Sequence, residues 1–390
     1  MSPQLVNEIG IQTAFVNTYH LVTHPGAEII EKAGGIHKYS QLNIPLMSDS
    51  GGFQVFSLAK KQYQISNIKD QNDISKIKDN QTKKAEVRDE EQQLLVKISE
   101  DGVKFRSTYD GTIVEFTPEK SMEYQAKIGA DINMAFDECT YYPATHEYAE
   151  KAMKRTHKWL KRCIYYKARD RKFFDGKQKT AKNLVPSLLN SHQFLYGVIQ
   201  GGTYEDLRKK SAEFVVSQNT PGVAIGGVSV GESKKEMRDQ IKWVSDYLPK
   251  DRPVHLLGVG QIDDIIDLVK YGIDTFDCVE PTRLARMGKI YQIDKARYQK
   301  FFNGKQKTVK NLVSHFEYDF DIFKNIYKAD FSPVDENCQC YVCQNFTKAY
   351  LHHLFKQREI LGYALATYHN LWVMEKLFDE IRELINRDLI

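Results

Sequence analysis

The stretch FLYGVIQGGTYEDLRKKSAEFVVSQNTPGVAIGGV (Phe194–Val228) decides the fold class. It contains two apolar runs, Phe194–Ile199 and Val223–Val228, separated by the amphipathic segment Tyr204–Ser217. Continuous apolar runs are typical of strands that are buried on both faces of a parallel sheet, and a helix between two such strands makes a βαβ unit. This stretch therefore predicts an α/β fold.

The same alternation of strands and helices extends in both directions along the chain. Further apolar runs predict strands at Ala14–Tyr19, Ile44–Met47, Ile132–Phe136, Val254–Leu257 and Thr275–Val279. Further amphipathic segments predict helices at Pro118–Ile128, Tyr148–Tyr166, Lys234–Tyr247 and Ile262–Tyr271. The alternation favours an α/β barrel, and an open doubly wound sheet is the alternative.

Polar segments interrupt this pattern at two places. Lys60–Gln93 has too few apolar residues to bury a face, so it predicts a solvated loop, and Arg169–Asn183 is a shorter, lysine-rich insertion. Between them, Leu95–Thr117 contains three β-branched runs joined by Asp-Gly dipeptides. Because Asp-Gly between such runs is a strong turn signal, this segment predicts a pair of β-hairpins.

The composition is that of a globular protein. Of the 390 residues, 42% are hydrophobic and 12% are aromatic, which is sufficient for a sizeable core. No apolar run is long enough to cross a bilayer, and the first residues lack the basic and apolar regions of a signal peptide, so we expect a cytoplasmic protein. The net charge of +4 permits a polyanionic partner without predicting one.

Polar residues follow several of the predicted strands directly. They are Asp49, Asp137, Gln200, the Gly226–Gly227 pair and Asp277. In an α/β barrel the carboxyl ends of the strands carry the active site, so we expect these residues to meet in one site. An aspartate after a strand can instead cap the next helix, but three aspartates with a Gln-Gly-Gly and a Gly-Gly favour the site.

These residue types suit glycosyl chemistry. One carboxylate can attack an electrophilic carbon and form a covalent adduct while another moves a proton. A glutamine offers a donor and an acceptor together, and glycines let the backbone approach a flat ligand closely. The pattern therefore indicates glycosyl transfer or hydrolysis, with a nucleobase among the candidate ligands.

Three of the six cysteines are clustered near the C-terminus. Cys338, Cys340 and Cys343 lie within six residues, a spacing that suits tetrahedral zinc with one further ligand. A buried apolar cluster of thiols is the alternative. On spacing alone the fourth ligand can be one of His352, His353 and His369.

Seven short motifs together resemble the signature series of the bacterial-type tRNA-guanine transglycosylases. They occur in that family's order, and the resemblance covers most of the chain. The motifs are NTYHL (Asn17–Leu21), DSGGFQVFSL (Asp49–Leu58), FDECT (Phe136–Thr140), GVIQGG (Gly197–Gly202), IGGVSVGE (Ile225–Glu232), LLGVG (Leu256–Gly260) and FDCVEPTR (Phe276–Arg283).

The resemblance implies how the site residues divide the reaction. Asp277 is expected to be the nucleophile on the ribose C1′ of tRNA, and Asp49 the general acid/base for the leaving guanine and the incoming base. The residues expected to bind or stack on the base are Asp49, Phe53, Asp137, Gln200, Gly226 and the Gly227 backbone N–H. The implied activity is exchange of the wobble guanine of GUN-anticodon tRNAs in queuosine biosynthesis.

The incoming base is expected to be preQ1 (7-aminomethyl-7-deazaguanine). Cys139 and the Val230–Glu232 segment resemble the bacterial pattern. Val230 would exclude the larger queuine, and Glu232 would orient the backbone toward the aminomethyl group. The alternative is that Val230 only packs against the strand.

The resemblance also implies a metal ligand, partners and a domain division. His369, in TYHNL, is the expected fourth ligand of one structural zinc per chain, with His353 as the rival. Arg283 and Arg286 are the best candidates for tRNA contact, and the protein is expected to form a homodimer. The expected domains are a barrel at 1–330, with an inserted loop and hairpin at about 60–117, and a zinc-binding subdomain at 331–390. Further candidates for tRNA contact are Lys348, Lys356 and Arg358.

The chain departs from the family pattern at its start. The family's first barrel strand and its capping hairpin are not recognisable before Pro3, so the expected fold is a (β/α)8 TIM-type barrel whose first strand is missing. A truncated or non-catalytic tRNA-binding paralogue is therefore the alternative function, and a glycoside hydrolase is a third. The presence of Asp49, Asp137, Gln200 and Asp277 together argues against the paralogue. The cysteine cluster, with Arg283 and Arg286, argues against the glycoside hydrolase.

Overall fold

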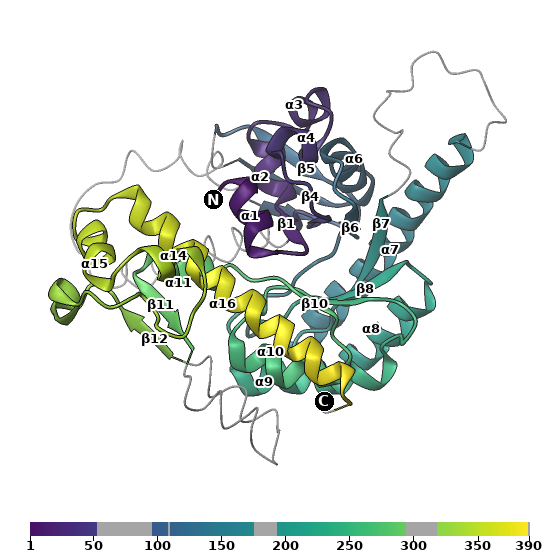
Figure 1. The fold of residues 1–390 in the computed structure, drawn as a ribbon. Helices are drawn as coiled ribbons and strands as arrows, with labels where there is room; N and C mark the ends of the chain where they lie inside the picture. The colour runs from purple at the N-terminus through teal and green to yellow at the C-terminus, as the bar shows by residue number, and fades with distance from the viewer. Residues whose placement is uncertain (53–95, 108–109, 175–192, 294–317, 389–390) are drawn as a thin grey trace, which may run out of the picture. The chain divides into compact units, whose positions relative to one another are not determined.

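The computed structural model describes residues 1–52, 96–107, 110–174, 193–293 and 318–388 (Figure 1). Phe53 and the predicted loop Lys60–Gln93 lie outside these ranges. The chain divides into two compact units, each described below by itself. One comprises Thr13–His255, and the other comprises Met1–Gln12 together with Leu256–Ile390.

Seven strands form one sheet. The strand order in the sheet is the order along the chain, and the first four strand pairings are parallel. A doubly wound sheet would reverse its order at a switch point, whereas strands that follow one another in sequence are typical of a barrel. The α/β fold of TIM type, with seven strands, is therefore confirmed. The strands are β1 (Ala14–Val16), β2 (Leu46–Ser48), β6 (Ile132–Met134), β7 (Phe194–Ile199), β8 (Gly222–Ile225), β9 (Val254–Leu256) and β10 (Thr275–Phe276).

All seven predicted strands are present, but several end earlier than predicted. β8 ends at Ile225 rather than Val228 because Gly227 has a φ of 63°, which is not an extended conformation. β6 ends at Met134 and β10 at Phe276. Asp137, Gly227 and Asp277 lie beyond these ends, in the loops that follow the strands.

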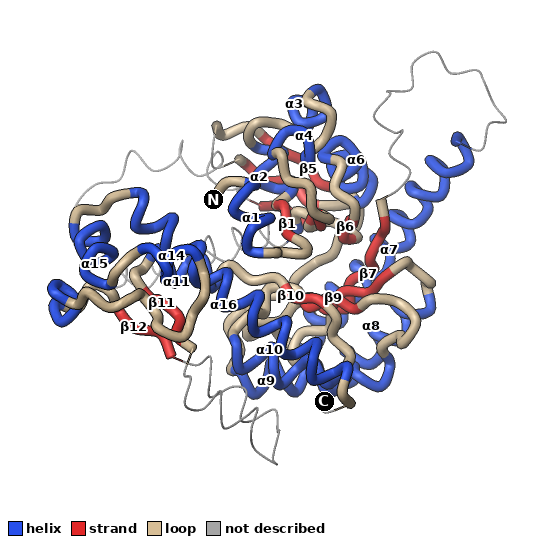
Figure 2. The backbone as a smooth tube through the Cα atoms, viewed as in Figure 1, coloured by secondary structure: helices blue, strands red, loops and turns tan. Residues whose placement is uncertain are grey.

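Helices follow the strands of the unit Thr13–His255, and the predicted helices are confirmed (Figure 2). Thr117 caps the start of α6 by accepting from the N–H of Lys120, and Gly129, with a φ of 76°, ends it. The helices that the structure describes in this unit are α2 (Thr18–Thr23), α3 (Ala27–Lys32), α4 (Ile36–Ser40), α6 (Pro118–Ile128), α7 (His146–Phe174), α8 (Glu205–Ser217), α9 (Lys234–Val244) and η2 (Ser245–Tyr247).

The helix α7 is longer than predicted. It continues to Phe174 and so includes the first part of the segment predicted as a lysine-rich insertion. The rest of that segment lies outside the described residues.

The predicted hairpin pair is a three-stranded antiparallel sheet. Its strands are β3 (Val96–Ile98), β4 (Val103–Arg106) and β5 (Ile113–Phe116). Phe105 and Phe116 are buried and their ring centroids lie 5.8 Å apart, so this sheet has an apolar face of its own.

The second unit is built around the long C-terminal helix. A buried apolar cluster includes Leu365, Val373, Leu377 and Ile381 of this helix. Outside the seven-stranded sheet, the described residues of the unit form α1 (Pro3–Ile9), α10 (Ile262–Leu268), η3 (Val269–Tyr271), α11 (Glu280–Arg286), β11 (Lys289–Gln292), β12 (Tyr318–Asp321), η4 (Asn325–Ala329), α14 (Tyr341–Asn345), α15 (Lys348–Lys356) and α16 (Ile360–Asn386). β11 and β12 pair antiparallel. Among the helices that the structure describes, none combines the length and apolar character needed to cross a bilayer.

Candidate active site and metal site

Asp49 lies at the end of β2 and is held by the start of α2. The Asn17 amide donates to Asp49 Oδ2 at 2.6 Å, and the backbone N–H of Thr18 donates to Oδ1 at 2.6 Å. Asn17 also caps α2 by accepting from the N–H of His20 at 2.9 Å. The NTYHL motif therefore fixes both carboxylate oxygens of Asp49 through donors that α2 itself positions.

Asp137 and Gln200 form a buried pair beside the Asp49 turn. Ser50, the residue after Asp49, donates to Asp137 Oδ1 at 2.8 Å, and Gln200 Nε2 donates to Oδ2 at 2.7 Å. Burial raises the pKa of Asp137 above its ordinary value, against the opposing effect of these two donors. Gln200 Oε1 is buried and has no hydrogen-bond partner among the described residues. A buried orphan acceptor of this kind suits an N–H donor of a ligand.

Gly227 lies directly against this pair. A Cβ added to Gly227 would lie 2.1 Å from Gln200 Oε1, and the φ of 63° strains any other residue there. The N–H of the neighbouring Gly226 donates to Ile199 O at 3.0 Å, which ties the turn after β8 to the end of β7. The structure therefore brings together Asp137, Gln200 and the glycine pair.

Arg208, on α8, is hydrogen-bonded to the turns after β7 and β8. This residue was not identified from the sequence. Its guanidinium is fully buried and donates to Gly202 O at 2.7 Å, Gly226 O at 2.6 Å and Gly227 O at 2.7 Å. Burial lowers the pKa of Arg208 to about 10, so the side chain remains charged at neutral pH. The sequence held no signal for this role, because an arginine on an amphipathic helix ordinarily faces solvent.

The loop after β8 carries Val230 and Glu232. The Glu232 carboxylate accepts from the N–H of Ser229 at 2.5 Å and of Val230 at 2.8 Å. Val230 is half-buried in this loop rather than on the strand. Glu232 therefore orders the backbone around Val230, which is consistent with the predicted role of orienting it.

The two residues after Asp137 have different environments. Burial raises the pKa of the Cys139 thiol to about 12, so it is not a nucleophile at neutral pH. Glu138 is fully buried, pairs with Arg155 and accepts from the Tyr148 hydroxyl at 2.8 Å. Glu138 was also missed from the sequence, and its paired charge indicates a structural role in fixing the FDECT turn.

Asp277 lies in the other unit, directly after β10. The backbone N–H of Gly258 donates to Asp277 Oδ1 at 3.0 Å. The two loops approach closely, since a Cβ added to Gly260 would lie 2.2 Å from Cys278 Cβ. The LLGVG motif thus positions the carboxylate of the FDCVEPTR motif, and Asp277 remains half-buried.

The basic candidates for tRNA contact differ in exposure. Arg283 and Arg286 are exposed on one face of α11, which begins three residues after Asp277, and Pro281 and Ala285 are buried on another. Lys348 is instead largely buried, donating to Ser332 Oγ at 3.0 Å, so it is a poor candidate for phosphate contact. Lys356 and Arg358 are exposed.

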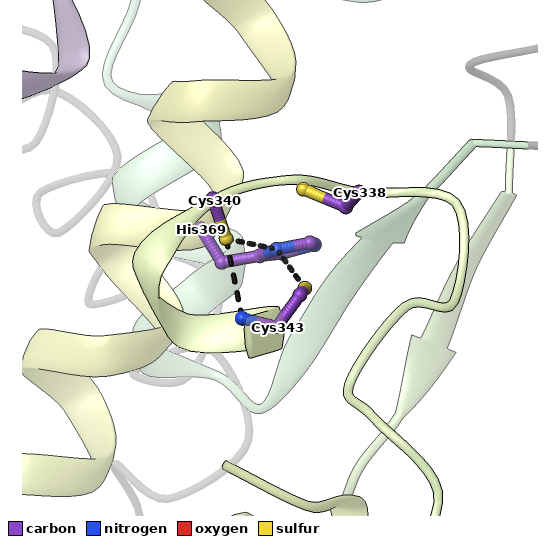
Figure 3. Close-up of side chains that lie close together, drawn as sticks. All are labelled: Cys338, Cys340, Cys343 and His369. Atoms are coloured by element: carbon purple, nitrogen blue, oxygen red, sulfur yellow. Dashed lines mark hydrogen bonds between the residues drawn. The ribbon is translucent and has the colours of Figure 1, made fainter. Parts of the chain in front are cut away.

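Three cysteines and one histidine meet in a buried cluster. The ligand atoms of Cys338, Cys340, Cys343 and His369 all lie within 4.8 Å of one another, and their side chains converge on one point (Figure 3). His369 Nδ1 lies 3.4 Å from Cys340 Sγ and 3.3 Å from Cys343 Sγ. Three thiols and an imidazole in this arrangement could bind a metal ion, and the donor set fits tetrahedral zinc.

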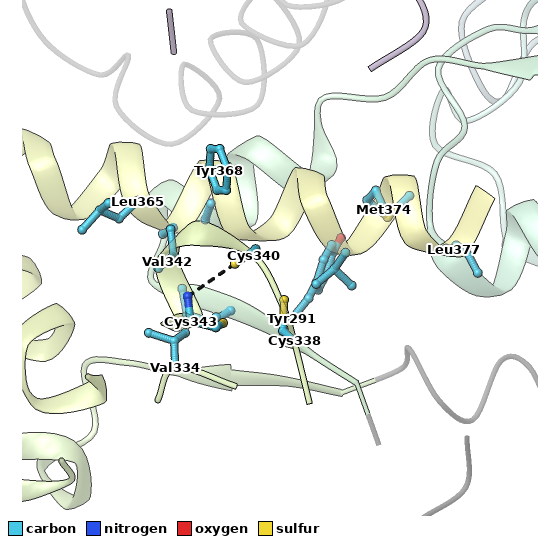
Figure 4. Packing of buried hydrophobic residues seen from close by; sticks show 14 of the residues in the cluster. Tyr291, Val334, Cys338, Cys340, Val342, Cys343, Leu365, Tyr368, Met374 and Leu377 are labelled. Atoms are coloured by element: carbon cyan, nitrogen blue, oxygen red, sulfur yellow. Dashed lines mark hydrogen bonds between the residues drawn. The ribbon is translucent and has the colours of Figure 1, made fainter. Parts of the chain in front are cut away.

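Neighbouring groups orient the histidine of this cluster. Its Nε2 lies 2.8 Å from Tyr291 O, so an Nε2–H that donates there leaves the Nδ1 lone pair toward the thiols. The rivals face elsewhere, because His352 Nδ1 pairs with Ile322 O at 2.6 Å and His353 is exposed. Tyr368, Met374 and Leu377 of α16 continue the buried apolar cluster around the cysteines (Figure 4).

The residue after His369 connects the cluster to α11. Asn370 is buried, accepts from the N–H of Tyr291 at 3.0 Å, and donates to Pro281 O at 3.1 Å and Lys289 O at 3.0 Å. Pro281 belongs to α11, the helix that follows Asp277. The cluster of three cysteines and His369 and the segment carrying Asp277 are therefore parts of one packed unit.

The fold and these residues define an enzyme of the α/β-barrel class, whose active-site residues follow the carboxyl ends of the strands. A family model described as "Queuine tRNA-ribosyltransferase" matches residues 1–77 and 82–390. A protein of that name from Caldanaerobacter subterraneus subsp. tengcongensis is 42% identical over 388 residues, which are 100% of this chain and 83% of the relative. One from Synechococcus elongatus is 38% identical over 388 residues, 100% of this chain and 81% of the relative. The chain belongs to the queuine tRNA-ribosyltransferase family, and it is a transferase of the glycosyltransferase type.

Proposed function

We propose that this enzyme exchanges the wobble guanine of GUN-anticodon tRNAs for preQ1 through a covalent aspartyl-ribose intermediate. The observation that carries the proposal is the buried pair Asp137 and Gln200 with the half-buried Gly227 beside it, a set that matches a guanine edge. Asp137 and the orphan Gln200 Oε1 are acceptors for the N–H groups of that edge, and the Gly227 N–H is a donor for its carbonyl oxygen. The relatives' printed names refer to queuine and tRNA, which fits a 7-deazaguanine and tRNA as substrates.

The proposed reaction needs two carboxylates with separate tasks. Asp277 attacks the ribose C1′, the bond from C1′ to the base nitrogen breaks, and the base leaves with the electron pair and takes a proton from Asp49. The incoming base then returns its proton to Asp49 and attacks C1′, which releases the Asp277 carboxylate. Asn17 and Thr18 hold Asp49 for this shuttle, and Gly258 holds Asp277.

The metal is proposed to be one structural zinc ion per chain. Cys338, Cys340, Cys343 and His369 would hold it, and four protein ligands leave no open position for a catalytic water. It would stabilise the unit that carries Asp277 rather than take part in the reaction.

The remaining parts of the proposal concern partners and organisation. Arg283 and Arg286 would pair with phosphates beside the extruded wobble nucleotide, since their guanidiniums are exposed. We further propose a cytoplasmic homodimer, with a catalytic domain at 1–330 and a zinc-binding subdomain at 331–390. Phe53 is proposed to stack on the base.

Radiolabelled guanine and unmodified GUN-anticodon tRNA test this function. We expect incorporation of label into that tRNA, no incorporation when its wobble guanine is replaced by adenine, and release of the label when preQ1 is added. The absence of incorporation from a folded, metal-loaded protein would instead support the non-catalytic tRNA-binding alternative.

Asp137→Asn is expected to weaken guanine binding without lowering the stability of the fold. Replacing the carboxyl by an amide removes one acceptor from the base site, so guanine affinity should fall by about 1–3 kcal/mol, roughly fivefold to 150-fold. The folded-state pKa of Asp137 is raised, so ionisation of this carboxyl opposes folding increasingly as the pH rises above its unfolded pKa.

The variant should therefore melt at the same or a higher temperature than the wild type, with the difference growing from pH 4 toward pH 8. Calorimetric guanine titration and melting curves across this range measure both effects. Unchanged guanine affinity in a folded Asp137→Asn protein would remove Asp137 from the base site.

Val230→Gly is expected to admit queuine. Overpacking costs on the order of 1–3 kcal/mol, so removing the branched side chain should raise activity with queuine roughly fivefold to a hundredfold and leave guanine exchange largely intact. Competition between unlabelled queuine and labelled guanine measures the change, with Val228→Ala, in the buried part of the same loop, as control. Equal use of queuine and preQ1 by the wild type would contradict the proposal that Val230 excludes queuine.

A further inference from the structure

The buried guanidinium of Arg208 has a distinctive set of partners. Besides three glycine carbonyls it donates from Nη2 to Gln240 Oε1 at 2.5 Å and from Nη1 to Ile199 O at 3.5 Å, and all five acceptors are neutral oxygens. Burying a cation is costly unless its N–H groups form hydrogen bonds. Most of the acceptors of Arg208 are backbone carbonyls. The cationic charge of Arg208 therefore acts on the peptide groups of the turns after β7 and β8.

One of these peptides carries the donor proposed for the base. The carbonyl of Gly226 and the N–H of Gly227 belong to the same planar peptide group, and in a trans peptide they point in opposite directions. The described cis peptides are at other positions, His24–Pro25 and Tyr142–Pro143. Because the Gly226 carbonyl points at Arg208 Nη1, the Gly227 N–H points away from Arg208.

The same contact strengthens that donor. A hydrogen bond from a cation to a carbonyl polarises the peptide and makes its N–H a better donor, an effect that is larger in a low-dielectric interior. The glycine at 227 is also required here, since its close approach to Gln200 Oε1 leaves no room for a Cβ.

We propose that Arg208 is a positioning residue that aims and polarises the Gly226–Gly227 peptide, so that the Gly227 N–H stabilises negative charge on the purine carbonyl oxygen as the base leaves. The inference rests on the proposed function. Negative charge reaches that oxygen mainly after the bond to C1′ begins to break, so the donor acts more strongly in the transition state than in the bound ground state. A residue that only held the fold together would affect stability and not this step.

The test compares Arg208→Lys and Arg208→Gln with a matched control, Arg252→Gln. Arg252 also donates to backbone carbonyls, Thr220 O at 3.0 Å and Val216 O at 3.4 Å, but contacts none of the site residues through these bonds. Lysine keeps the charge of Arg208, yet it cannot reproduce a planar fork that reaches several carbonyls at once. Guanine exchange, the KM for tRNA and the melting temperature are measured for each protein.

We expect kcat for guanine exchange to fall roughly a hundredfold in Arg208→Gln, the loss typical of one oxyanion donor, and less in Arg208→Lys. The KM for tRNA should stay within about twofold, and Arg252→Gln should keep the wild-type kcat. If Arg208→Gln does not fold, Arg208→Lys alone should still show reduced kcat with unchanged tRNA KM.

Two results would overturn the inference while the wild type remains active. One is a wild-type kcat in Arg208→Lys and in any folded Arg208→Gln. The other is a loss of kcat that disappears when the assay temperature is lowered to equalise the folded fractions, because that loss reflects stability alone. A wild type that exchanges no guanine would instead refute the proposed function.

Discussion

Asp277→Asn is expected to reduce guanine exchange at least roughly a thousandfold, because an amide oxygen cannot replace a carboxylate as nucleophile on C1′. The fold should survive the change. The amide oxygen of asparagine can still accept the Gly258 N–H that Asp277 Oδ1 accepts at 3.0 Å, and the two side chains have nearly the same size. Single-turnover incorporation of labelled guanine into GUN-anticodon tRNA measures the loss.

The matched control for this variant is Asp274→Asn. Asp274 is exposed and precedes β10, whereas Asp277 follows it, so the same chemical change is made at the opposite end of one strand. We expect the control to exchange guanine at the wild-type rate. An unaltered exchange rate in Asp277→Asn would remove this residue from the mechanism.

Removal of the metal is expected to have the largest effect on stability. His369→Ala deletes one of four proposed ligands and also leaves the Tyr291 carbonyl, which is 2.8 Å from Nε2, without this contact. Since structural zinc binding is coupled to folding, we expect a loss of at least about 3 kcal/mol and less than one zinc ion per chain. Zinc stoichiometry and limited proteolysis of the segment 318–388 measure these effects.

His353→Ala is the control, since His353 is adjacent in sequence to a buried histidine but is itself exposed. It should retain one zinc ion and the wild-type proteolysis pattern. Full zinc in His369→Ala together with loss of zinc in His353→Ala would reverse the ligand assignment. A folded wild-type protein with far less than one equivalent of metal would contradict the zinc site altogether.

The fold was predictable where local sequence determines it. The apolar run Phe194–Ile199 forms β7 over the same residues, because a strand buried on both faces needs nearly continuous apolar side chains. Pro118–Ile128 likewise forms α6, because Thr117 and Gly129 provide start and stop signals next to it. The strand ends were less predictable, since Val228 is apolar but follows a glycine pair whose conformation depends on contacts with Gln200 and Arg208.

Parts of the site depend on contacts that are distant in sequence. Arg208 reaches the carbonyl of Gly227 across 19 positions, and Glu138 pairs with Arg155 across 17. A buried charge on an amphipathic helix has the same local pattern as an exposed one, so neither was identified. The spacing of the cysteines also left three histidines open as the fourth ligand. The family resemblance selected His369, and the structure places it with the three thiols.

The central claim is a covalent link between Asp277 and tRNA, and trapping that link tests it most directly. Labelled GUN-anticodon tRNA is incubated with the wild type, denatured in detergent and separated by size. We predict that part of the tRNA migrates with the protein, that guanine added before denaturation releases it, and that Asp277→Asn retains none. Full-rate guanine exchange with no tRNA attached to the protein, or equal attachment to Asp277→Asn, would contradict the aspartyl-ribose intermediate.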